Sequence, residues 1–278
     1  MYKIVEKKVL NSQVKSITVE APHVAKKAMP GQFIMFRIDE DGERIPLTIS
    51  DYDREKGTVT IVFQEVGATT MQLGTLEAGD SLLDFVGPLG KASHFENVKH
   101  AAVIGGGLGS AIAYPQARAL FEKGAVVDTI MGFRNKDIVI LEDEMKAVSS
   151  ECIITTDDGS NGTKGFVSDI LRQRIESGIV YDLVVAIGPP IMMKVVAELT
   201  RPYGIPTWVS LNPIMIDGTG MCGGCRVTVD GKTKFACVDG PDFDGHKVDF
   251  DELMRRLSMY REVEAKQREA HVCRLGGK

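Results

Sequence analysis

Three cysteines and one aspartate in the last quarter of the chain have the spacing of a metal or cluster site. Asp217 precedes Cys222 and Cys225, and Cys237 follows the segment 226–236, whose alternating apolar residues predict a β-hairpin. Plant-type [2Fe–2S] proteins use the frame C-x4-C-x2-C with a distant fourth cysteine. Asp217 takes the first position of that frame, and a carboxylate oxygen can also ligate iron. The four side chains therefore predict a [2Fe–2S] cluster.

Structural zinc is the alternative, because C-x2-C pairs also bind zinc. Zinc needs a fourth ligand, and Cys273, far along the chain, can supply it. The x4-x2 spacing favours iron. Four glycines between residues 217 and 225 also favour a cluster, because they let the backbone wrap an inorganic core and direct amides at its sulfurs.

Composition limits the classes of protein that this chain can belong to. The 278 residues, 44% hydrophobic and 26% charged, can bury a core in two or three units. The net charge of −5 gives no reason to expect nucleic acid or an anionic membrane as a partner. We also find no apolar run of membrane-spanning length and no signal-peptide pattern at the start. Five cysteines, three of them clustered, fit thiolate ligands in a reducing compartment, which predicts a cytoplasmic protein.

The first part of the chain, residues 1–97, predicts a small antiparallel β-barrel. Alternation from 5 to 20 indicates a hairpin, and 33–38 and 58–64 predict further strands. Two polar stretches interrupt this pattern. One is Arg44-Ile45-Pro46-Leu47-Thr48. The other, Gly67-Ala68-Thr69-Thr70, stands before a helix predicted to begin near residue 71, where hydroxyls and free amides can hold a pyrophosphate.

The middle part, residues 98–211, predicts an α/β domain with a parallel sheet. The apolar run 100–104 leads into Gly105-Gly106-Gly107-Leu108-Gly109 and then a helical pattern, which is the phosphate-binding unit of nucleotide-binding domains. Strands predicted at 126–132, 152–155, 183–187 and 207–211 alternate with helices predicted at 138–145, 166–177 and 192–200. Gly188-Pro189 ends one of these strands, at the sheet edge where ligands bind.

The last part, residues 212–278, holds the cysteine motif and a predicted charged helix over 249–268. Its apolar members at 253, 257, 260 and 263 recur at helical spacing, which favours a helix packed along one stripe.

Taken together, these motifs resemble the ferredoxin–NADP reductase superfamily. The resemblance covers the whole chain and rests on the stretches 30–33, 44–48, 105–109, 217–225 and 235–241. It is closest to the subgroup with a C-terminal [2Fe–2S] module. That subgroup contains the electron-transfer subunit of dihydroorotate dehydrogenase and the small subunit of NADH-dependent reduced ferredoxin:NADP oxidoreductase. Aspartate in the first ligand position favours the second of these, because the dihydroorotate subunit is expected to carry four cysteines.

The resemblance implies FAD between barrel and nucleotide domain, with NAD(H) approaching the flavin. Flavin contacts carry over onto Pro46, Leu47 and Thr48, onto Val62, Phe63 and Gln64, and onto Gly67, Thr69 and Thr70. NAD(H) contacts carry over onto Gly105–Gly109 and Gly188-Pro189. The sequence leaves the choice of dinucleotide open, because Arg134 fits a 2′-phosphate whereas the resemblance implies NAD.

The chain departs from the superfamily pattern at three positions. In the signature R-x-Y-[ST] ending at Thr48, the arginine position holds Ile45 and the neighbouring Arg44 carries the cation. Leu47 replaces the usual flavin-stacking tyrosine, and Ile187 replaces a frequent cysteine before Gly188.

The expected function is electron transfer. Hydride would be exchanged between NAD(H) and FAD, and single electrons would pass through the cluster; the protein supplies orientation, and we assign no general acid or base. The resemblance implies a larger partner subunit with its own FAD, [4Fe–4S] clusters and NADP(H) site, hence indirect exchange with ferredoxin and electron bifurcation. The alternatives are the dihydroorotate dehydrogenase electron-transfer subunit and, in a different class, a non-catalytic nucleotide-binding protein stabilised by zinc.

Overall fold

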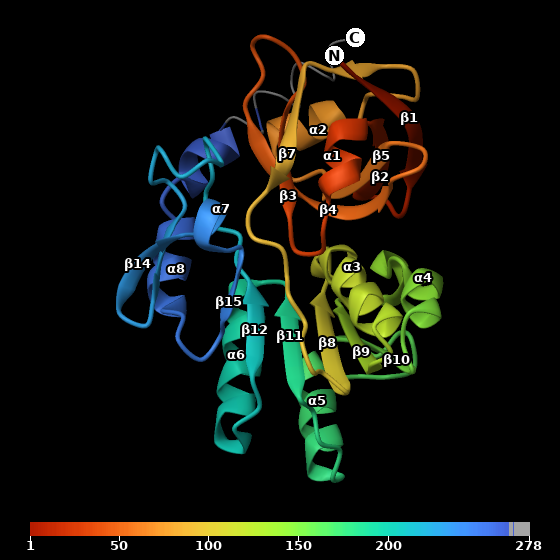
Figure 1. The fold of residues 1–278 in the computed structure, drawn as a ribbon, viewed down its shortest axis with the longest axis vertical. Coiled ribbons are helices and arrows are strands. Elements are labelled where there is room, and N and C mark those ends of the chain that lie inside the picture. Colours follow the sequence, from red (N-terminus) through yellow and green to blue (C-terminus); the bar gives the residue numbers. More distant parts are fainter. Residues whose placement is uncertain (267–268, 270–278) are drawn as a thin grey trace.

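The barrel predicted for the first part of the chain is present in the computed structural model, which describes residues 1–266 and 269 (Figure 1). Seven antiparallel strands follow the order β6-β1-β2-β5-β4-β3-β7 and form a nearly closed barrel. The strands are β1 (Tyr2–Val9), β2 (Val14–Glu20), β3 (Phe33–Arg37), β4 (Ile45–Asp53), β5 (Thr58–Gln64), β6 (Ser81–Leu82) and β7 (Asp84–Leu89), with helices α1 (Pro22–Lys27) and α2 (Ala68–Leu73).

Apolar side chains at alternating positions of these strands fill the core of the barrel. Ile17 on β2 pairs with Ile61 on β5, and both side chains are fully buried, as are Phe36, Phe63 and Phe85. The stretch 44–48, predicted as a polar interruption, instead opens strand β4. Pro46 stands opposite Met35 on β3 and has no N–H to donate, which is why sequence rules count proline against a strand.

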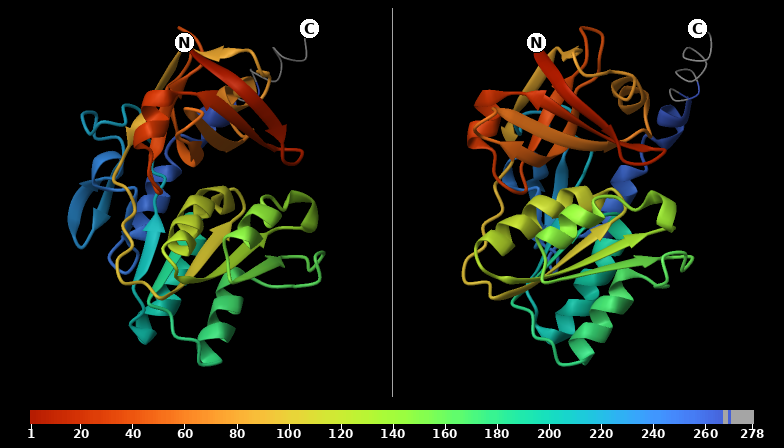
Figure 2. Two further views of the ribbon diagram at one scale, coloured as in Figure 1. Left: turned by 45° about the vertical axis from the view of Figure 1, so that its right-hand side comes forward. Right: turned by 90° about the vertical axis from the view of Figure 1, so that its right-hand side faces the viewer.

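The middle part folds as the predicted α/β domain (Figure 2). Its sheet has the order β10-β9-β8-β11-β12-β15, and all strands but the last are parallel. The strands are β8 (His100–Gly106), β9 (Val126–Phe133), β10 (Glu151–Thr156), β11 (Leu183–Ile187) and β12 (Thr207–Ser210); the helices are α3 (Gly109–Glu122), α4 (Glu142–Ala147), α5 (Val167–Glu176) and α6 (Pro190–Thr200). Apolar residues of α3 and α4 pack in one core with one face of the sheet, and those of α5 and α6 pack in another with the opposite face.

Three predicted helices differ from the structure. The helix predicted over 138–145 is a 3-10 turn, η1 (Lys136–Ile138), followed by α4, because Leu141 has a φ of 55° and interrupts the path. Helix α2 begins at residue 68 rather than 71, since the Thr70 hydroxyl oxygen accepts the Gly67 amide and caps the earlier turn. The helix predicted over 249–268 divides into α8 (Phe250–Leu257), a turn over 258–260 and a second helical stretch over 261–266. The last two residues of the predicted helix, 267–268, lie outside the described residues.

The third part contains the hairpin β13 (Arg226–Val229) and β14 (Lys232–Phe235), the short helix α7 (Ala236–Asp239), strand β15 (Asp242–Asp244) and α8. β15 pairs antiparallel with β12 and so becomes the edge of the nucleotide-domain sheet. The core of this part is continuous with that beneath α5 and α6, and it also includes Phe33 and Met35 of the barrel. The boundaries expected near residues 97 and 211 stay predictions.

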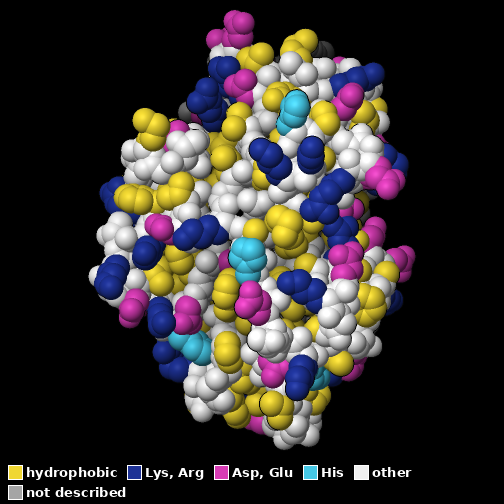
Figure 3. Space-filling model, viewed as in Figure 1, with side chains coloured by type: hydrophobic (Ala, Val, Ile, Leu, Met, Phe, Trp, Pro, Cys, Tyr) yellow, Lys and Arg dark blue, Asp and Glu magenta, His cyan; other side chains and the backbone are white. Residues whose placement is uncertain are grey.

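Two features of the described residues concern the surroundings of the protein: the composition of the helices and the distribution of surface charge. None of their helices has both the length and the apolar composition needed to cross a membrane. On the face drawn in Figure 3, acidic and basic side chains are interspersed, in line with the small net charge.

Candidate functional site

Two of the predicted cluster ligands lie side by side in the core of the third part. The hairpin β13–β14 returns the chain so that Cys225 and Cys237, both buried, place their Sγ atoms 3.1 Å apart. The Ala236 amide donates to the Cys225 carbonyl at 3.1 Å, which fixes the two strand ends against each other. Burial, together with the neighbouring Cys225 thiol, raises the pKa of the Cys237 thiol.

The other two predicted ligands lie together at the start of the loop. The Oδ2 atom of Asp217 accepts the Thr219 amide at 2.9 Å, the Thr219 hydroxyl at 2.6 Å and the Met221 amide at 3.2 Å. Cys222 is exposed. The Gly224 amide lowers the pKa of its thiol, and the Asp217 backbone amide contributes in the same direction while the Asp217 carboxylate opposes it. The hydrogen bond from the Met221 amide holds the Asp217 carboxylate against the residue that precedes Cys222.

Cys225 and Cys237 thus form a pair, and Asp217 and Cys222 lie in the loop that leads into it. Among the described residues, no three His, Cys, Asp or Glu side chains stand together as a ready-made metal site. A binuclear cluster carries two protein ligands on each iron, so one thiol pair with two further ligands in the same loop matches its needs better than those of one tetrahedral zinc. Cys273, the alternative zinc ligand, lies outside the described residues.

The cysteine loop packs directly on the barrel. Gly218 has a φ of 83°, and a Cβ there would lie 2.7 Å from the Met35 side chain and 3.1 Å from that of Leu89. Met35 stands opposite Pro46, one of the predicted flavin contacts. The charge of Arg44 also acts on this loop, at Asp217. The hydrogen bonds from Thr219 come first in lowering the pKa of Asp217, and the Arg44 guanidinium lowers it further.

The predicted flavin residues lie on the neighbouring strands β4 and β5. Thr48 pairs with Phe33, and Leu47 pairs with Ile34, so this end of β4 runs beside β3. Along β5, Phe63 points into the barrel core, so only its backbone can reach a ligand there. Val62, on the opposite face, packs with the core of the nucleotide domain.

A cavity of about 430 Å³ opens beside α2, and three of the predicted flavin contacts line it. Its lining residues are Glu43, Ile45, Val66, Gly67, Ala68, Thr69, Thr70, Arg261, Glu264 and Ala265. The Thr69 hydroxyl donates to Glu43 at 3.0 Å, and the Thr70 hydroxyl donates to the Gly67 carbonyl at 3.0 Å. The sequence pattern did not point to Glu43 or Arg261, because neither belongs to a recognisable motif.

The predicted nucleotide residues meet at the carboxyl ends of β8 and β11. A Cβ on Gly109 would lie 2.3 Å from the Ile187 carbonyl oxygen, and one on Gly106 would lie 3.1 Å from Pro189. The glycines therefore let two loops touch. The order of strands changes direction here, since β9 follows β8 on one side while β11 and β12 lie on the other. Such a switch point is where α/β sheets bind ligands.

A buried polar junction joins the parts of the molecule, and no sequence motif marks it. Asp242 on β15 accepts hydrogen bonds through Oδ2 from the Ser93 hydroxyl and from the Gln116 amide of α3, the latter at 3.2 Å. Ser93 belongs to the segment between barrel and nucleotide domain. Burial raises the pKa of Asp242 to about 6 in spite of these hydrogen bonds. The junction ties β15 to α3 and to the segment between barrel and nucleotide domain, so its role is to hold these parts in position.

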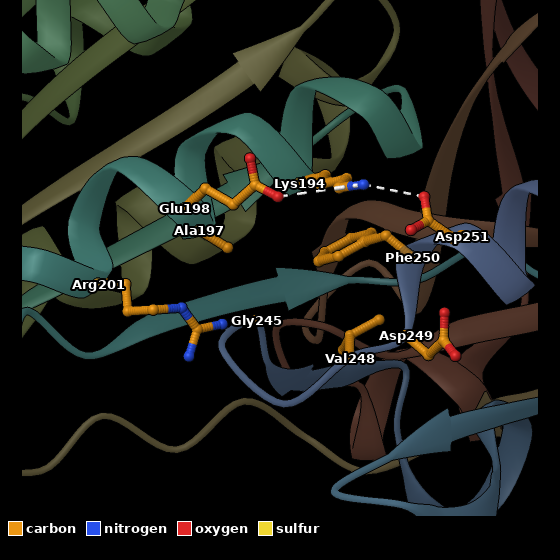
Figure 4. A pocket seen from close by; sticks show the side chains of 9 residues that line it. All are labelled: Lys194, Ala197, Glu198, Arg201, Gly245, Val248, Asp249, Phe250 and Asp251. Atoms are coloured by element: carbon orange, nitrogen blue, oxygen red, sulfur yellow. Dashed lines mark hydrogen bonds and ion pairs between the residues drawn. The ribbon is translucent and has the colours of Figure 1, made fainter.

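A second hollow, of about 200 Å³, lies between α6 and the segment 245–251, away from all these residues (Figure 4). Lys194 there pairs with Asp251 at 2.9 Å and with Glu198 at 4.0 Å. Arg201 donates to the His246 carbonyl at 2.7 Å. Lys194 is thus paired with two carboxylates and Arg201 with a backbone carbonyl, and the predicted sites do not include this hollow.

Known proteins resemble this chain both in the cysteine region and over its whole length. The family model "Iron-sulfur cluster binding domain of dihydroorotate dehydrogenase B" matches residues 212–249, which contain all four predicted ligands. A Thermotoga maritima protein described as "Dihydroorotate dehydrogenase B (NAD(+)), electron transfer subunit homolog" is 49% identical over 261 residues, 94% of this chain and 92% of that one. The chain belongs to the dihydroorotate dehydrogenase B electron-transfer subunit family.

Two further similar proteins and one more distant structure extend the comparison. An uncharacterised Clostridium beijerinckii protein from the adh 3′ region is 55% identical over 274 residues, 96% of this chain and 93% of that one. A solved structure of NADH-dependent reduced ferredoxin–NADP oxidoreductase, studied for flavin-based electron bifurcation, is 47% identical, with a TM-score of 0.92 over 98% of both chains. A ferredoxin reductase of carbazole 1,9a-dioxygenase, 19% identical with a TM-score of 0.62 over 74% of this chain and 65% of that one, shares the fold.

The family assignment confirms the resemblance, the three-part fold and the kinds of cofactor predicted from the sequence. The iron–sulfur domain and the ferredoxin-reductase-like flavin and nucleotide fold give this electron-transfer subunit the complement of FAD, iron–sulfur cluster and NAD(H). It is an oxidoreductase subunit.

Proposed function

We propose that this chain passes electrons between NAD(H) and a larger partner subunit by way of FAD and a [2Fe–2S] cluster. One observation carries the proposal. The predicted flavin strand β4, the Met35 side chain on β3 and the cysteine loop at Gly218 are in unbroken contact. A flavin on β4 would therefore lie one side-chain layer from the cluster, which suits electron transfer.

The barrel's role is to bind and orient FAD. Pro46, Leu47 and Thr48 of β4 and Val62, Phe63 and Gln64 of β5 would hold the isoalloxazine, with Phe63 acting through its backbone. Gly67, Thr69 and Thr70 would hold the diphosphate in the cavity beside α2. Bound FAD supplies the conversion between the electron pair of a nicotinamide and single electrons.

The role of the nucleotide domain is to present NAD(H) to the barrel. Gly105–Gly109 and Gly188-Pro189 form a small-residue floor that lets backbone approach a dinucleotide. This floor faces β4, because the Ser50 hydroxyl on β4 donates to the Ala111 carbonyl of α3 at 2.8 Å. The hydrogen bond fixes the barrel and the nucleotide domain with respect to each other.

For the cluster we propose a division of ligands that follows the observed cysteine pair and the order of the chain. Cys225 and Cys237 would bind one iron, and Asp217 and Cys222, which precede them in the loop, the other. The hydrogen bonds that Asp217 accepts from Thr219 and Met221 all end on Oδ2. Ligation through Oδ1 is therefore compatible with the loop as it stands, and the loop would hold the carboxylate in one orientation.

The partner would approach the exposed side of the cysteine loop. Three apolar side chains of this region are exposed: Ile216 by 61%, Met221 by 87% and Val238 by 39%. Met221 precedes the exposed Cys222, and Ile216 and Val238 pack beside glycines of the same loop. Uncovered apolar side chains of this size are typical of a protein interface. The structural relative at 47% identity supports an electron-bifurcating complex of the NADH-dependent reduced ferredoxin–NADP oxidoreductase type. In such a complex we propose a larger partner with its own flavin and [4Fe–4S] clusters, as the sequence resemblance implies.

A second candidate is the electron-transfer subunit of a dihydroorotate dehydrogenase, which the family model and the relatives' names favour. The two candidates differ in the larger subunit. Isolation of the native complex tests both, because its partner is either a large flavin and iron–sulfur protein that reacts with NADP(H) and ferredoxin or a dihydroorotate-oxidising flavoprotein.

Analysis of flavin, iron, acid-labile sulfide and zinc in the purified chain tests the cofactors. We expect FAD together with equal amounts of iron and sulfide, and a visible spectrum that contains both flavin and iron–sulfur bands. A colourless chain that contains zinc would contradict the proposal and support the structural zinc alternative.

A further inference from the structure

The cavity beside α2 has two walls from distant parts of the chain. Gly67–Thr70, Glu43 and Ile45 form the barrel wall, and Arg261, Glu264 and Ala265 form the other. Its volume of about 430 Å³ lies within the range of about 300–1,000 Å³ that is typical of ligand pockets. The second wall is therefore part of a site that can hold a small molecule.

The second wall is held in place by its connection to α8. Phe250 and Leu253 anchor α8 in the core, and α8 ends at Leu257. The chain then turns over 258–260 and resumes a helical path over 261–266, where the Glu264 amide donates to the Tyr260 carbonyl at 2.9 Å. Figure 2 shows this blue segment rising from the lower part of the molecule to lie beside the barrel.

Charged side chains of both signs line the cavity. Two carboxylates, Glu43 and Glu264, and one cation, Arg261, line it. The Thr69 hydroxyl already donates to Glu43. Arg261 is thus the cation among the lining residues that can bind an anion, and its planar guanidinium matches phosphate oxygens bidentately.

We propose that residues 258–266 form the outer wall of the flavin site and that Arg261 binds the diphosphate of FAD. This inference rests on the proposed function, because it assigns the cavity to the ADP half of the flavin cofactor. It implies selection of FAD over FMN, since FMN has no diphosphate and no adenosine to fill the cavity. The third part of the chain then serves the flavin as well as the cluster.

The test compares flavin affinities of two charge-removing variants of the full chain, Arg261→Gln and Lys266→Gln. Lys266 is exposed in the same helical stretch and does not line the cavity, so it is a matched control. The chains are stripped of flavin, and binding of FAD and of FMN is measured by fluorescence titration at low and high salt. Thermal unfolding of each stripped variant checks that it is folded.

We expect Arg261→Gln to weaken FAD binding by about tenfold or more, as for loss of a hydrogen bond to a charged group, with FMN affinity close to wild type. Lys266→Gln should bind both flavins like wild type. The salt dependence of FAD binding should be smaller in Arg261→Gln. Unchanged FAD affinity in Arg261→Gln, equal losses for both flavins, or an equal loss in Lys266→Gln would overturn the inference. A wild-type chain that binds neither flavin would instead refute the proposed function.

Discussion

The Sγ atoms of Cys225 and Cys237 lie 3.1 Å apart, whereas the Asp217 carboxylate, at the beginning of the same loop, accepts hydrogen bonds from the Thr219 and Met221 amides. The pairing follows from the hairpin, which closes the distance between Cys225 and Cys237 without help from the rest of the loop. It makes the role of Asp217 the most informative point to test.

Replacement of Asp217 distinguishes two roles of its carboxylate: iron ligand, or hydrogen-bond acceptor that holds the loop together. Asp217→Cys should keep both irons, because a thiolate replaces the carboxylate, but its visible spectrum and reduction potential should shift. Asp217→Asn retains an acceptor for the Thr219 and Met221 amides and loses the negative charge, so it should lose iron if Asp217 is a ligand. Iron and sulfide analysis with EPR of the reduced protein provides the measurement. An intact, unchanged cluster in Asp217→Ala would place the fourth ligand elsewhere, first of all at Cys273.

The contact between cysteine loop and barrel can be tested at Gly218. Alanine there must adopt a left-handed backbone and also displace Met35, whereas Gly231 has a similar φ of 68° and open space around it. Gly231→Ala should therefore cost only the backbone term of about 1–2 kcal/mol, and Gly218→Ala should cost about 1–3 kcal/mol more. Urea unfolding of the two variants measures the difference. Equal losses of unfolding free energy in the two variants would mean that the cysteine loop does not pack against Met35 of the barrel.

Asp242 should give the protein an unusual pH dependence. Its pKa is raised from 3.8 to about 6 by burial, so the folded state prefers the neutral form. The free energy of unfolding contributed by this group is complete below pH 3.8 and is lost as the pH rises through about 6. The difference between the two pKa values corresponds to about 3 kcal/mol.

Asp242→Asn should remove this contribution and flatten the stability profile between pH 4 and pH 6. Chemical unfolding at several pH values in that window provides the measurement, and Asp244→Asn, at a half-exposed position two residues away, is a suitable control. A slope in Asp242→Asn equal to that of wild type would assign the pH dependence to another group.

Asp128 should contribute to stability rather than to electron transfer. Its carboxylate is buried and accepts hydrogen bonds from Arg174 at 2.7 Å, Tyr181 at 2.8 Å and His100 at 2.9 Å. Burial alone would raise the pKa of Asp128, yet these hydrogen bonds hold it below 3.8. Its stabilising effect is therefore present above pH 3.8 and is lost as the pH falls below that value.

Asp128→Ala should cost about 3–5 kcal/mol at neutral pH, because it leaves the Arg174 charge partly unpaired in the interior. Glu151→Gln removes the other, half-exposed partner of Arg174 and should cost about 0–1 kcal/mol. Differential unfolding in urea tests the pair. A small loss in Asp128→Ala would show that the network contributes little.

Much of the fold could be predicted because its signals are local. Apolar runs such as 100–104 followed by glycines mark parallel strands and their turns, and alternation marks the hairpin over 5–20. Where prediction was wrong, the cause is a contact or backbone angle without a local signal. Leu141 adopts a positive φ that nothing in its residue type suggests, and Pro46 lies in a strand although proline usually argues against one.

The candidate site divides in the same way. The ligands Asp217, Cys222, Cys225 and Cys237 follow a fixed spacing and can be found in one sequence. Arg261 and Met35 have no motif, because their relation to the site depends on how distant elements pack. Strand β15 is only three residues long, too short for alternation to identify it.

That short strand has a practical consequence. Cutting the chain after Leu211 would uncover the β12 edge, and unprotected edges invite pairing with other molecules. A truncated protein lacking the cysteine loop would thus be prone to self-association, so loss of activity in such a fragment would say little about the cluster. Designers who wish to graft this electron relay onto another reductase would have to carry a sheet edge along with it.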